Sequence, residues 1–348
     1  DYRIFSNLRA KCEVMSGSLY SSYLESLQNG LHDNIKLFWN HINYKDGCND
    51  LPPVMKLNDF VASSPPEIAD LFASYFSSVF DPPTTQTPTY PVRDVVSLGV
   101  LTITEDAVRR ELSSLDVNKG MGPDGILLRN CCQSLFSPLT SIFNYSLESG
   151  SFPSQWKCSY ITPIHKSGDK SEIKHYRPIS TICAIPKILE KLVILQIYPE
   201  LSHYLVNEQH GFVRGRSTVT NLLEFQEYVM KGFEQHVQVD VINTDYSKAF
   251  DRLSHHHVLR LLESIGIHGA LLNWLTDYLS DRRLIVKIKG DLSRPFIASS
   301  GIPQGSHVGP LIFLMMINGV HEVFGQVKCL LFADDLKFFS YIESHLDC

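Results

Sequence analysis

The chain has 348 residues, of which 44% are apolar and 20% are charged, with a formal net charge of −6. This length allows two or three domains with a sizeable core. No apolar run approaches the ~20 residues of a membrane span, so no membrane partner is expected. The eight cysteines lack Cys-x-x-Cys spacing, which argues against a zinc site or a disulfide framework and favours a reducing compartment.

The charge is unevenly distributed along the chain. Residues 153–216 contain nine Lys and Arg against five acids, a balance of +4, which leaves −10 for the remainder. A net negative charge argues against a nucleic-acid-binding protein, but a separate basic region removes part of that objection. The alternative, that individual lysines form an ordinary solvated surface, stays open.

The N-terminal third has the pattern of helices. Residues 17–44 show helical spacing, and Ser64 with Glu67 forms a capping box that has prolines in the first turn. A proline-rich loop is expected over 81–90 and a further helix over 104–115. The apolar stripe after the capping box is expected in the core; it comprises Ile68, Leu71, Phe72, Tyr75 and Phe76.

The C-terminal part alternates strands and helices. A strand is predicted over 236–244, then a helix that Ser254 caps and Gly266 ends, and a second helix around Trp274. A hairpin follows over 284–299. This order predicts one antiparallel sheet with helices on one face, which is an α+β fold.

Two of these elements carry carboxylates that could bind metal. The strand over 236–244 ends in Asp245, and residues 327–339 predict a hairpin whose turn contains Asp334 and Asp335. Each aspartate alone is equally compatible with an ordinary strand end or turn. In neighbouring strands they would supply a two-metal phosphoryl-transfer site, with the metals roughly 4 Å apart. Magnesium is the cation that suits such a site.

A glycine-rich loop lies between the carboxylate segments. Ser300–Pro310 contains Gly301, Gly305 and Gly309 and runs into an apolar helix. Glycines at this density permit close approach of the backbone to a ligand.

In this order the segments resemble the palm motifs of the reverse transcriptases. Asp245 with Phe250 resembles the first motif, Pro303-Gln304-Gly305 the second, and Phe332-Ala333-Asp334-Asp335 the third. Residues 122–125, 176–180 and 209–217 resemble fingers motifs of non-LTR (LINE-type) retrotransposons, and the N-terminal stretch is similar to the segment that precedes the polymerase in jockey-like elements.

The resemblance implies a right-hand polymerase with fingers and palm. Residues 1–90 are expected to be a helical segment that links a missing endonuclease to the polymerase, and residues 91–152 a helical extension of the fingers. Residues 153–348 are expected to be the reverse transcriptase domain, truncated after the Asp-Asp hairpin so that the thumb is absent. The chain is therefore expected to be a fragment of a polyprotein.

The resemblance also implies a catalytic metal site. Asp245, Asp334 and Asp335 are expected to be catalytic and, with Tyr246, to hold two Mg²⁺, for which Mn²⁺ can substitute. Consecutive histidines at 255–257 face different directions on a helix and are not expected to bind metal.

The remaining residues that the resemblance implicates bind substrate. Arg177 is expected to hold the triphosphate, assisted by Lys166 or by the neighbouring Lys170. Phe250 is expected to lie beneath the sugar and exclude a 2′-hydroxyl, or to be a core aromatic. Gln304 and Gly305 are expected near the incoming nucleotide, with a plain loop amide as the alternative for Gln304. Basic side chains expected to contact template or primer, or to brace the fingers, are Arg214 and Arg216.

The implied function is RNA-directed DNA polymerase activity, with an RNA template, a DNA primer or target DNA, and dNTPs as partners. The isolated fragment is expected to be poorly active, and the parent ribonucleoprotein is expected in the cytoplasm and nucleus. The alternative is a catalytically inactive relic, or a domesticated nucleic-acid-binding protein with the same fold. All three carboxylates and Gln304 are intact, and the flanking genomic DNA would separate these alternatives.

Overall fold

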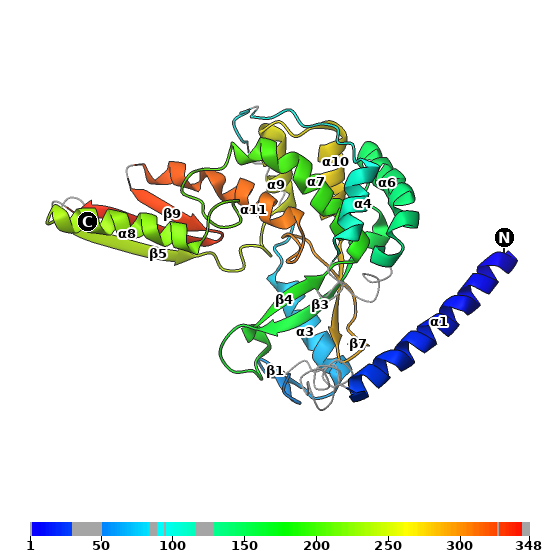
Figure 1. Ribbon diagram of the computed structural model, residues 1–348. Coiled ribbons are helices and arrows are strands. Elements are labelled where there is room, and N and C mark those ends of the chain that lie inside the picture. The colour runs from blue at the N-terminus through cyan, green and yellow to red at the C-terminus, as the bar shows by residue number, and fades with distance from the viewer. Residues whose placement is uncertain are drawn as a thin grey trace.

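The computed structural model describes residues 2–29, 51–83, 89–93, 95–115, 128–325 and 327–342. Its strands form a two-stranded hairpin, a three-stranded sheet and a five-stranded sheet, with helices gathered between and above the two larger sheets (Figure 1). This mixture of helices and sheets confirms the α+β class. The resemblance at 122–125 lies outside the described residues.

The five-stranded sheet has the order β4-β3-β6-β7, and β8 also pairs with β6. All its pairs are antiparallel except β3 with β6, which is parallel. The hairpin predicted over 284–299 is present, but its first strand joins β3, so the expectation of one antiparallel sheet is wrong. The strands are β3 (Cys158–His165), β4 (Tyr176–Thr181), β6 (Arg283–Ile288), β7 (Asp291–Leu292) and β8 (Phe296–Ile297).

Helix α3 (Pro65–Val79) covers one face of this sheet. The Ser64 N–H donates to the Glu67 carboxylate (3.3 Å), as the capping box predicts. Phe72 and Phe76 are buried, and Phe72 meets the Tyr176 ring edge to face at 5.2 Å. The alternating apolar residues of β6 pack in this same core, which explains why β6 joins β3.

Residues 1–90, expected to be a helical segment, also contain β1 (Met55–Leu57) and β2 (Phe60–Ala62), which form a hairpin. Met55 and Ala62 share the core of α3 and the five-stranded sheet. Residues on both sides of position 90 therefore share one hydrophobic core. The division of the chain into functional segments at this position stays a prediction. Helix α1 (Tyr2–Asn29) extends away from the rest, and its described side chains are exposed (Figure 1).

A second core lies among the helices, around the fully buried Trp274 and Tyr278. Thr104 and Ser254 cap the two helices that the sequence predicts after them. None of the described helices is long and apolar enough to cross a lipid bilayer. The helices are α4 (Glu105–Ser113), α6 (Cys132–Ser149), α7 (Ala184–Ser202), α9 (His255–Ser264), α10 (Gly269–Leu279) and α11 (Val308–Ile317), with 3₁₀ turns η1 (Ser154–Lys157), η2 (Ile173–His175) and η3 (Asn318–Phe324).

The three-stranded sheet is antiparallel, has the order β5-β10-β9 and contains Asp245 and Asp335, whereas Asp334 lies in the turn between β9 and β10. Helix α8 lies along it (Figure 1), and its residues Phe225 and Tyr228 contact Phe339 of β10 edge to face. The elements are α8 (Thr218–Glu234), β5 (Gln238–Asp245), β9 (Lys328–Phe332) and β10 (Asp335–Ile342).

Candidate active site

Asp245 and Asp335 are directly opposite each other in the three-stranded sheet. Asp245 ends β5, and Asp335 begins β10. Residues paired in this way place their side chains on the same face, with Cβ atoms about 4.5–5.5 Å apart. Asp334 follows Ala333 in the turn between β9 and β10. The structure thus brings together the three carboxylates that the sequence singles out.

The electrostatics of Asp334 reflect this grouping. Its pKa is raised above the usual range, first because the carboxyl is partly removed from solvent and then because Asp335 and Asp245 add negative charge. The Asp334 backbone N–H and the Arg177 guanidinium lower the pKa and oppose this shift. Arg177 therefore lies within electrostatic reach of the carboxylates, although β4 belongs to the other sheet.

Gln304 and Gly305 lie in the loop that leads to α11. The Ser180 N–H of β4 donates to the Gln304 backbone carbonyl (3.0 Å), which ties this loop to the five-stranded sheet. Gly305 has a φ of +109°, and a Cβ at this position would lie 2.8 Å from the Ser180 carbonyl oxygen. The close approach and the positive φ together require glycine here.

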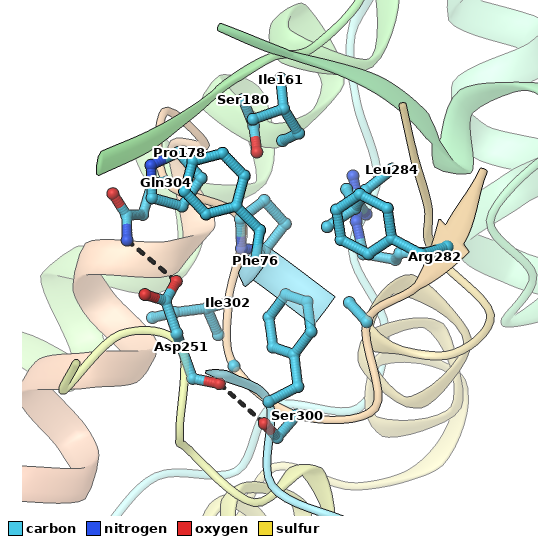
Figure 2. A pocket seen from close by; sticks show the side chains of 15 residues that line it. Phe76, Ile161, Pro178, Ser180, Asp251, Arg282, Leu284, Ser300, Ile302 and Gln304 are labelled. Atoms are coloured by element: carbon cyan, nitrogen blue, oxygen red, sulfur yellow. Dashed lines mark hydrogen bonds between the residues drawn. The ribbon is translucent and has the colours of Figure 1, made fainter. Parts of the chain in front are cut away.

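The side chain of Gln304 points toward Asp251, and its Nε2 donates to Asp251 Oδ1 (2.9 Å; Figure 2). Burial raises the pKa of Asp251, whereas this hydrogen bond and the charge of Lys248 lower it. The Nε2 group of Gln304 thus already makes a hydrogen bond within the protein. A contact between Gln304 and a nucleotide stays a prediction.

A cavity of about 30 Å³ lies behind this loop. Phe76, Ile161 and Arg282 line it together with Gln304 (Figure 2). A water molecule needs ~10–15 Å³ by this measure, so the cavity has room for one or two waters. The cavity is far too small for a nucleotide.

Phe250 packs against other aromatic rings and is also partly accessible to solvent. Its ring stacks on Phe313 of α11 at 4.4 Å and meets Phe212 edge to face at 6.1 Å. The side chain is only partly buried. The core alternative is therefore correct for its packing, and the role beneath the sugar stays a prediction.

The two arginines predicted to contact template or primer differ in their surroundings. The Arg216 guanidinium donates to the carbonyls of Val206 (3.0 Å), Asn207 (2.7 Å) and Gln209 (2.6 Å). Arg214 is exposed and lies over the Tyr198 ring at 4.6 Å. Arg216 thus braces its own loop, whereas the charge of Arg214 is accessible to solvent.

Lys166 and Tyr246 lie at the ends of strands that border the site. Lys166 is exposed immediately after β3, where its N–H donates to the His175 carbonyl (2.8 Å). Tyr246 follows Asp245 and is 44% exposed. Their roles in binding triphosphate and metal stay predictions.

Sequence reasoning missed several side chains that hold the site segments. Glu190 of α7 is completely buried and accepts the His307 N–H (2.8 Å) at the start of α11. His255 Nε2 lies 2.7 Å from the Gly301 carbonyl oxygen, so this histidine fixes the same loop. Gln209 binds the turn that carries Asp334. Each partner lies far away in the sequence, so no local pattern signals these contacts.

The donor set at Asp245, Asp334 and Asp335 consists of hard carboxylate oxygens and suits Mg²⁺. Burial, and then repulsion from Asp335 and Asp245, raise the pKa of Asp334, and a bound cation would relieve the repulsion. Within the described part of the chain, no group of three His, Cys, Asp or Glu side chains is arranged so that it could hold a metal ion. Mg²⁺ commonly retains waters and binds substrate phosphates, so an incomplete protein donor set still fits this ion.

Comparisons with known proteins found several relatives of this chain. A "Probable RNA-directed DNA polymerase from transposon BS" of Drosophila melanogaster is 29% identical over 63% of this chain and 25% of its own length. The "RNA-directed DNA polymerase from mobile element jockey" of the same species is 26% identical over 63% of the chain and 24% of its length. A "Retrovirus-related Pol polyprotein from type-1 retrotransposable element R2" of Popillia japonica is 28% identical over 54% of this chain and 28% of its own length.

The chain thus matches about a quarter of the length of these curated relatives. The family model described as "Reverse transcriptase (RNA-dependent DNA polymerase)" matches residues 164–348, more than half of the chain and all three aspartates. The chain belongs to the reverse transcriptase family, and its relatives confirm the LINE-type branch that the sequence motifs indicated.

Proposed function

We propose that this chain is the catalytic part of an RNA-directed DNA polymerase that extends a DNA primer on an RNA template. The cross-strand pair of Asp245 and Asp335, with Asp334 in the adjoining turn, carries the proposal. The three-stranded sheet and the helices beside it act as the palm, and the five-stranded sheet acts as the fingers. Arg177, which lies on β4 and within electrostatic reach of Asp334, marks where the two meet.

Asp245, Asp334, Asp335 and the Tyr246 carbonyl would hold two Mg²⁺, with Mn²⁺ as a substitute. Bound metals at such sites neutralise charge on the attacking and leaving oxygens and align them. The register that places Asp245 opposite Asp335, with Asp334 in the adjoining turn, supports this assignment.

Other side chains position the nucleotide. Arg177 neutralises the triphosphate, assisted by Lys166, because a guanidinium can bind phosphate oxygens with two hydrogen bonds. Phe250 lies under the sugar, while Gln304 and Gly305 border the base pair. In the reaction, the primer 3′-hydroxyl loses its proton to solvent and its oxygen bonds to the α-phosphorus. The bond from that phosphorus to the bridging oxygen breaks, and pyrophosphate leaves.

The partners in this proposal are RNA template, DNA primer or target DNA, and dNTPs. Arg214 offers an exposed charge to a phosphate, whereas Arg216 acts by bracing its loop. The parent ribonucleoprotein would act in the cytoplasm and nucleus.

Extension of a DNA primer on an RNA template by the purified chain, with dNTPs and Mg²⁺, tests the proposal. We expect slow extension that Asp335→Asn abolishes and Asp291→Asn preserves, because Asp291 is an exposed residue of the other sheet. Retention of the wild-type rate by Asp335→Asn contradicts the proposal. A wild-type chain that binds primer–template but does not extend it supports an inactive relic instead.

A further inference from the structure

Ala333 has a backbone conformation that needs support. It precedes Asp334 in the turn and has a φ of +57°, which is uncommon for a residue with a side chain. Such conformations are strained and persist only where the surrounding structure holds them. The turn that places Asp334 therefore depends on contacts from the surrounding structure.

One side chain holds both polar backbone groups of Ala333. Gln209 Oε1 accepts the Ala333 N–H (3.0 Å), and Gln209 Nε2 donates to the Ala333 carbonyl (3.4 Å). That carbonyl belongs to the peptide that joins Ala333 to Asp334. The orientation of the Asp334 backbone is thus linked directly to the Gln209 amide.

Gln209 is itself fixed in place. It is 2% exposed, and its Oε1 also accepts the Gly211 N–H (2.7 Å). It forms a parallel bridge with Leu331 of β9, and the adjacent His210 N–H donates to the Leu331 carbonyl (2.9 Å). The segment around Gln209 therefore extends the three-stranded sheet beyond β9.

Two neighbouring residues make this contact close and rigid. A Cβ on Gly211 would lie 2.1 Å from the Ala333 nitrogen, so the backbones approach where no side chain fits. Arg216 donates to three carbonyls of the segment over 206–209, one of them that of Gln209. A guanidinium suits this task because its N–H groups lie in a fixed plane.

We infer that Gln209 is a positioning residue, which holds the Ala333 turn so that Asp334 can bind metal, and that Arg216 keeps Gln209 in place. The inference rests on the proposed function, because it assigns Gln209 to the same carboxylate site. Gln209 touches neither metal nor substrate in this role. Residues that orient metal ligands typically affect metal affinity or activity by about 10–100-fold.

Binding of Mn²⁺, followed by electron paramagnetic resonance, tests the inference without turnover. Gln209→Met keeps the length and packing of the side chain but removes all three of its hydrogen bonds. The matched control is Gln196→Met, because Gln196 Nε2 also donates to a backbone carbonyl, that of Thr102 (2.9 Å), away from the turn. Melting temperature, the rate of nucleotide addition and the KM for dNTP are measured for the same proteins.

We expect Gln209→Met to weaken Mn²⁺ binding and lower the rate of nucleotide addition by about 10–100-fold, with little change in the KM for dNTP. Gln196→Met should keep wild-type Mn²⁺ affinity. A folded Gln209→Met protein with wild-type Mn²⁺ affinity overturns the inference. If Gln209→Met does not fold, Arg216→Met decides, since it keeps much of the apolar stem of the side chain but removes every hydrogen bond from the guanidinium to the carbonyls. A weaker Mn²⁺ affinity in this variant supports the inference, and an unchanged affinity overturns it.

Asp334→Asn separates this inference from the proposed function. If Asp334→Asn weakens Mn²⁺ binding but the Gln209 variant does not, the metal site stands and the positioning role is wrong. If wild type and Asp334→Asn bind Mn²⁺ equally, the proposed metal site and the positioning role are both wrong.

Discussion

The Gln304 amide donates a hydrogen bond to the buried Asp251 carboxylate at 2.9 Å. Asp251 follows Phe250 in the turn after β5, whereas Gln304 lies in the loop before α11. This hydrogen bond therefore connects the segment that follows β5 with the loop expected to border the nucleotide.

Replacement of Gln304 by alanine should destabilise the protein in a pH-dependent way. Burial raises the pKa of Asp251 in the folded state. At pH values above that pKa the ionised carboxylate therefore lowers the stability of the protein. This cost disappears as the pH falls below the pKa that Asp251 has in the unfolded state. Without the Gln304 hydrogen bond the cost should increase by about 1–3 kcal/mol. Melting temperatures across acidic to neutral pH should show the largest deficit near neutrality.

The Asp251→Asn background provides the control for this effect. There the pH dependence of the Gln304→Ala deficit should disappear, because residue 251 no longer titrates. A deficit of the same size at every pH in the otherwise wild-type protein would show that the Asp251 charge is not involved.

Asp334→Asn should stabilise the metal-free protein at neutral pH. Burial, Asp335 and Asp245 disfavour the ionised Asp334, so its folded-state pKa is raised and its charge lowers stability at pH values above that pKa. Because the group is partly exposed, solvent screening limits the gain to on the order of 0.5 kcal/mol, or about 1–2 °C in Tm. The gain should vanish as the pH falls below the unfolded pKa.

Differential scanning calorimetry with and without Mg²⁺ measures this change, and Asp291→Asn is the control. Mg²⁺ should raise the Tm of the wild type more than that of Asp334→Asn. A metal-free Asp334→Asn protein that melts below the wild type would contradict the repulsion among the three carboxylates.

The sequence predicts the secondary structure around the carboxylates because alternating apolar residues mark β5, and two apolar runs on either side of the Asp-Asp turn mark β9 and β10. It also predicts that Asp245 and Asp334 meet. It does not predict that β6 joins β3 in parallel, since the alternating pattern of β6 fits either sheet and only packing against α3 decides between them. Contacts such as Gln209 with Ala333, 124 residues apart, leave no local periodicity and were missed.

Phe250→Val should increase incorporation of ribonucleotides on the order of tenfold, because it removes bulk expected beneath the sugar. It should also lower the Tm, since Phe250 stacks on Phe313. Competition between dNTP and NTP during primer extension measures the selectivity. Phe225→Val, which alters a partly buried aromatic against Phe339, should leave selectivity unchanged. Equal selectivity of Phe250→Val and the wild type would place the discrimination elsewhere.

RNA binding should be weak and salt-sensitive, and the two arginines should differ in their effect on it. Arg214 is exposed, so we expect it to contact one phosphate. Arg214→Ala should therefore make the slope of log affinity against log salt concentration shallower by the amount that one phosphate contact contributes, about one unit. Arg216→Ala should leave the slope nearly unchanged and lower the Tm, since its guanidinium binds backbone carbonyls. Fluorescence anisotropy across salt concentrations checks both, and the opposite pattern would exchange the two roles.

The rate of single-nucleotide addition to a DNA primer on an RNA template most directly tests whether the β5 and β9–β10 carboxylates form the catalytic site. Asp245→Asn should be compared with Asp240→Asn, because Asp240 is an exposed aspartate of the same strand whose carboxylate accepts a hydrogen bond from Gln238. We expect Asp245→Asn to be slower than wild type by at least about 100-fold, with Asp240→Asn close to wild type. Wild-type rates from a folded Asp245→Asn protein would contradict the proposed catalytic site.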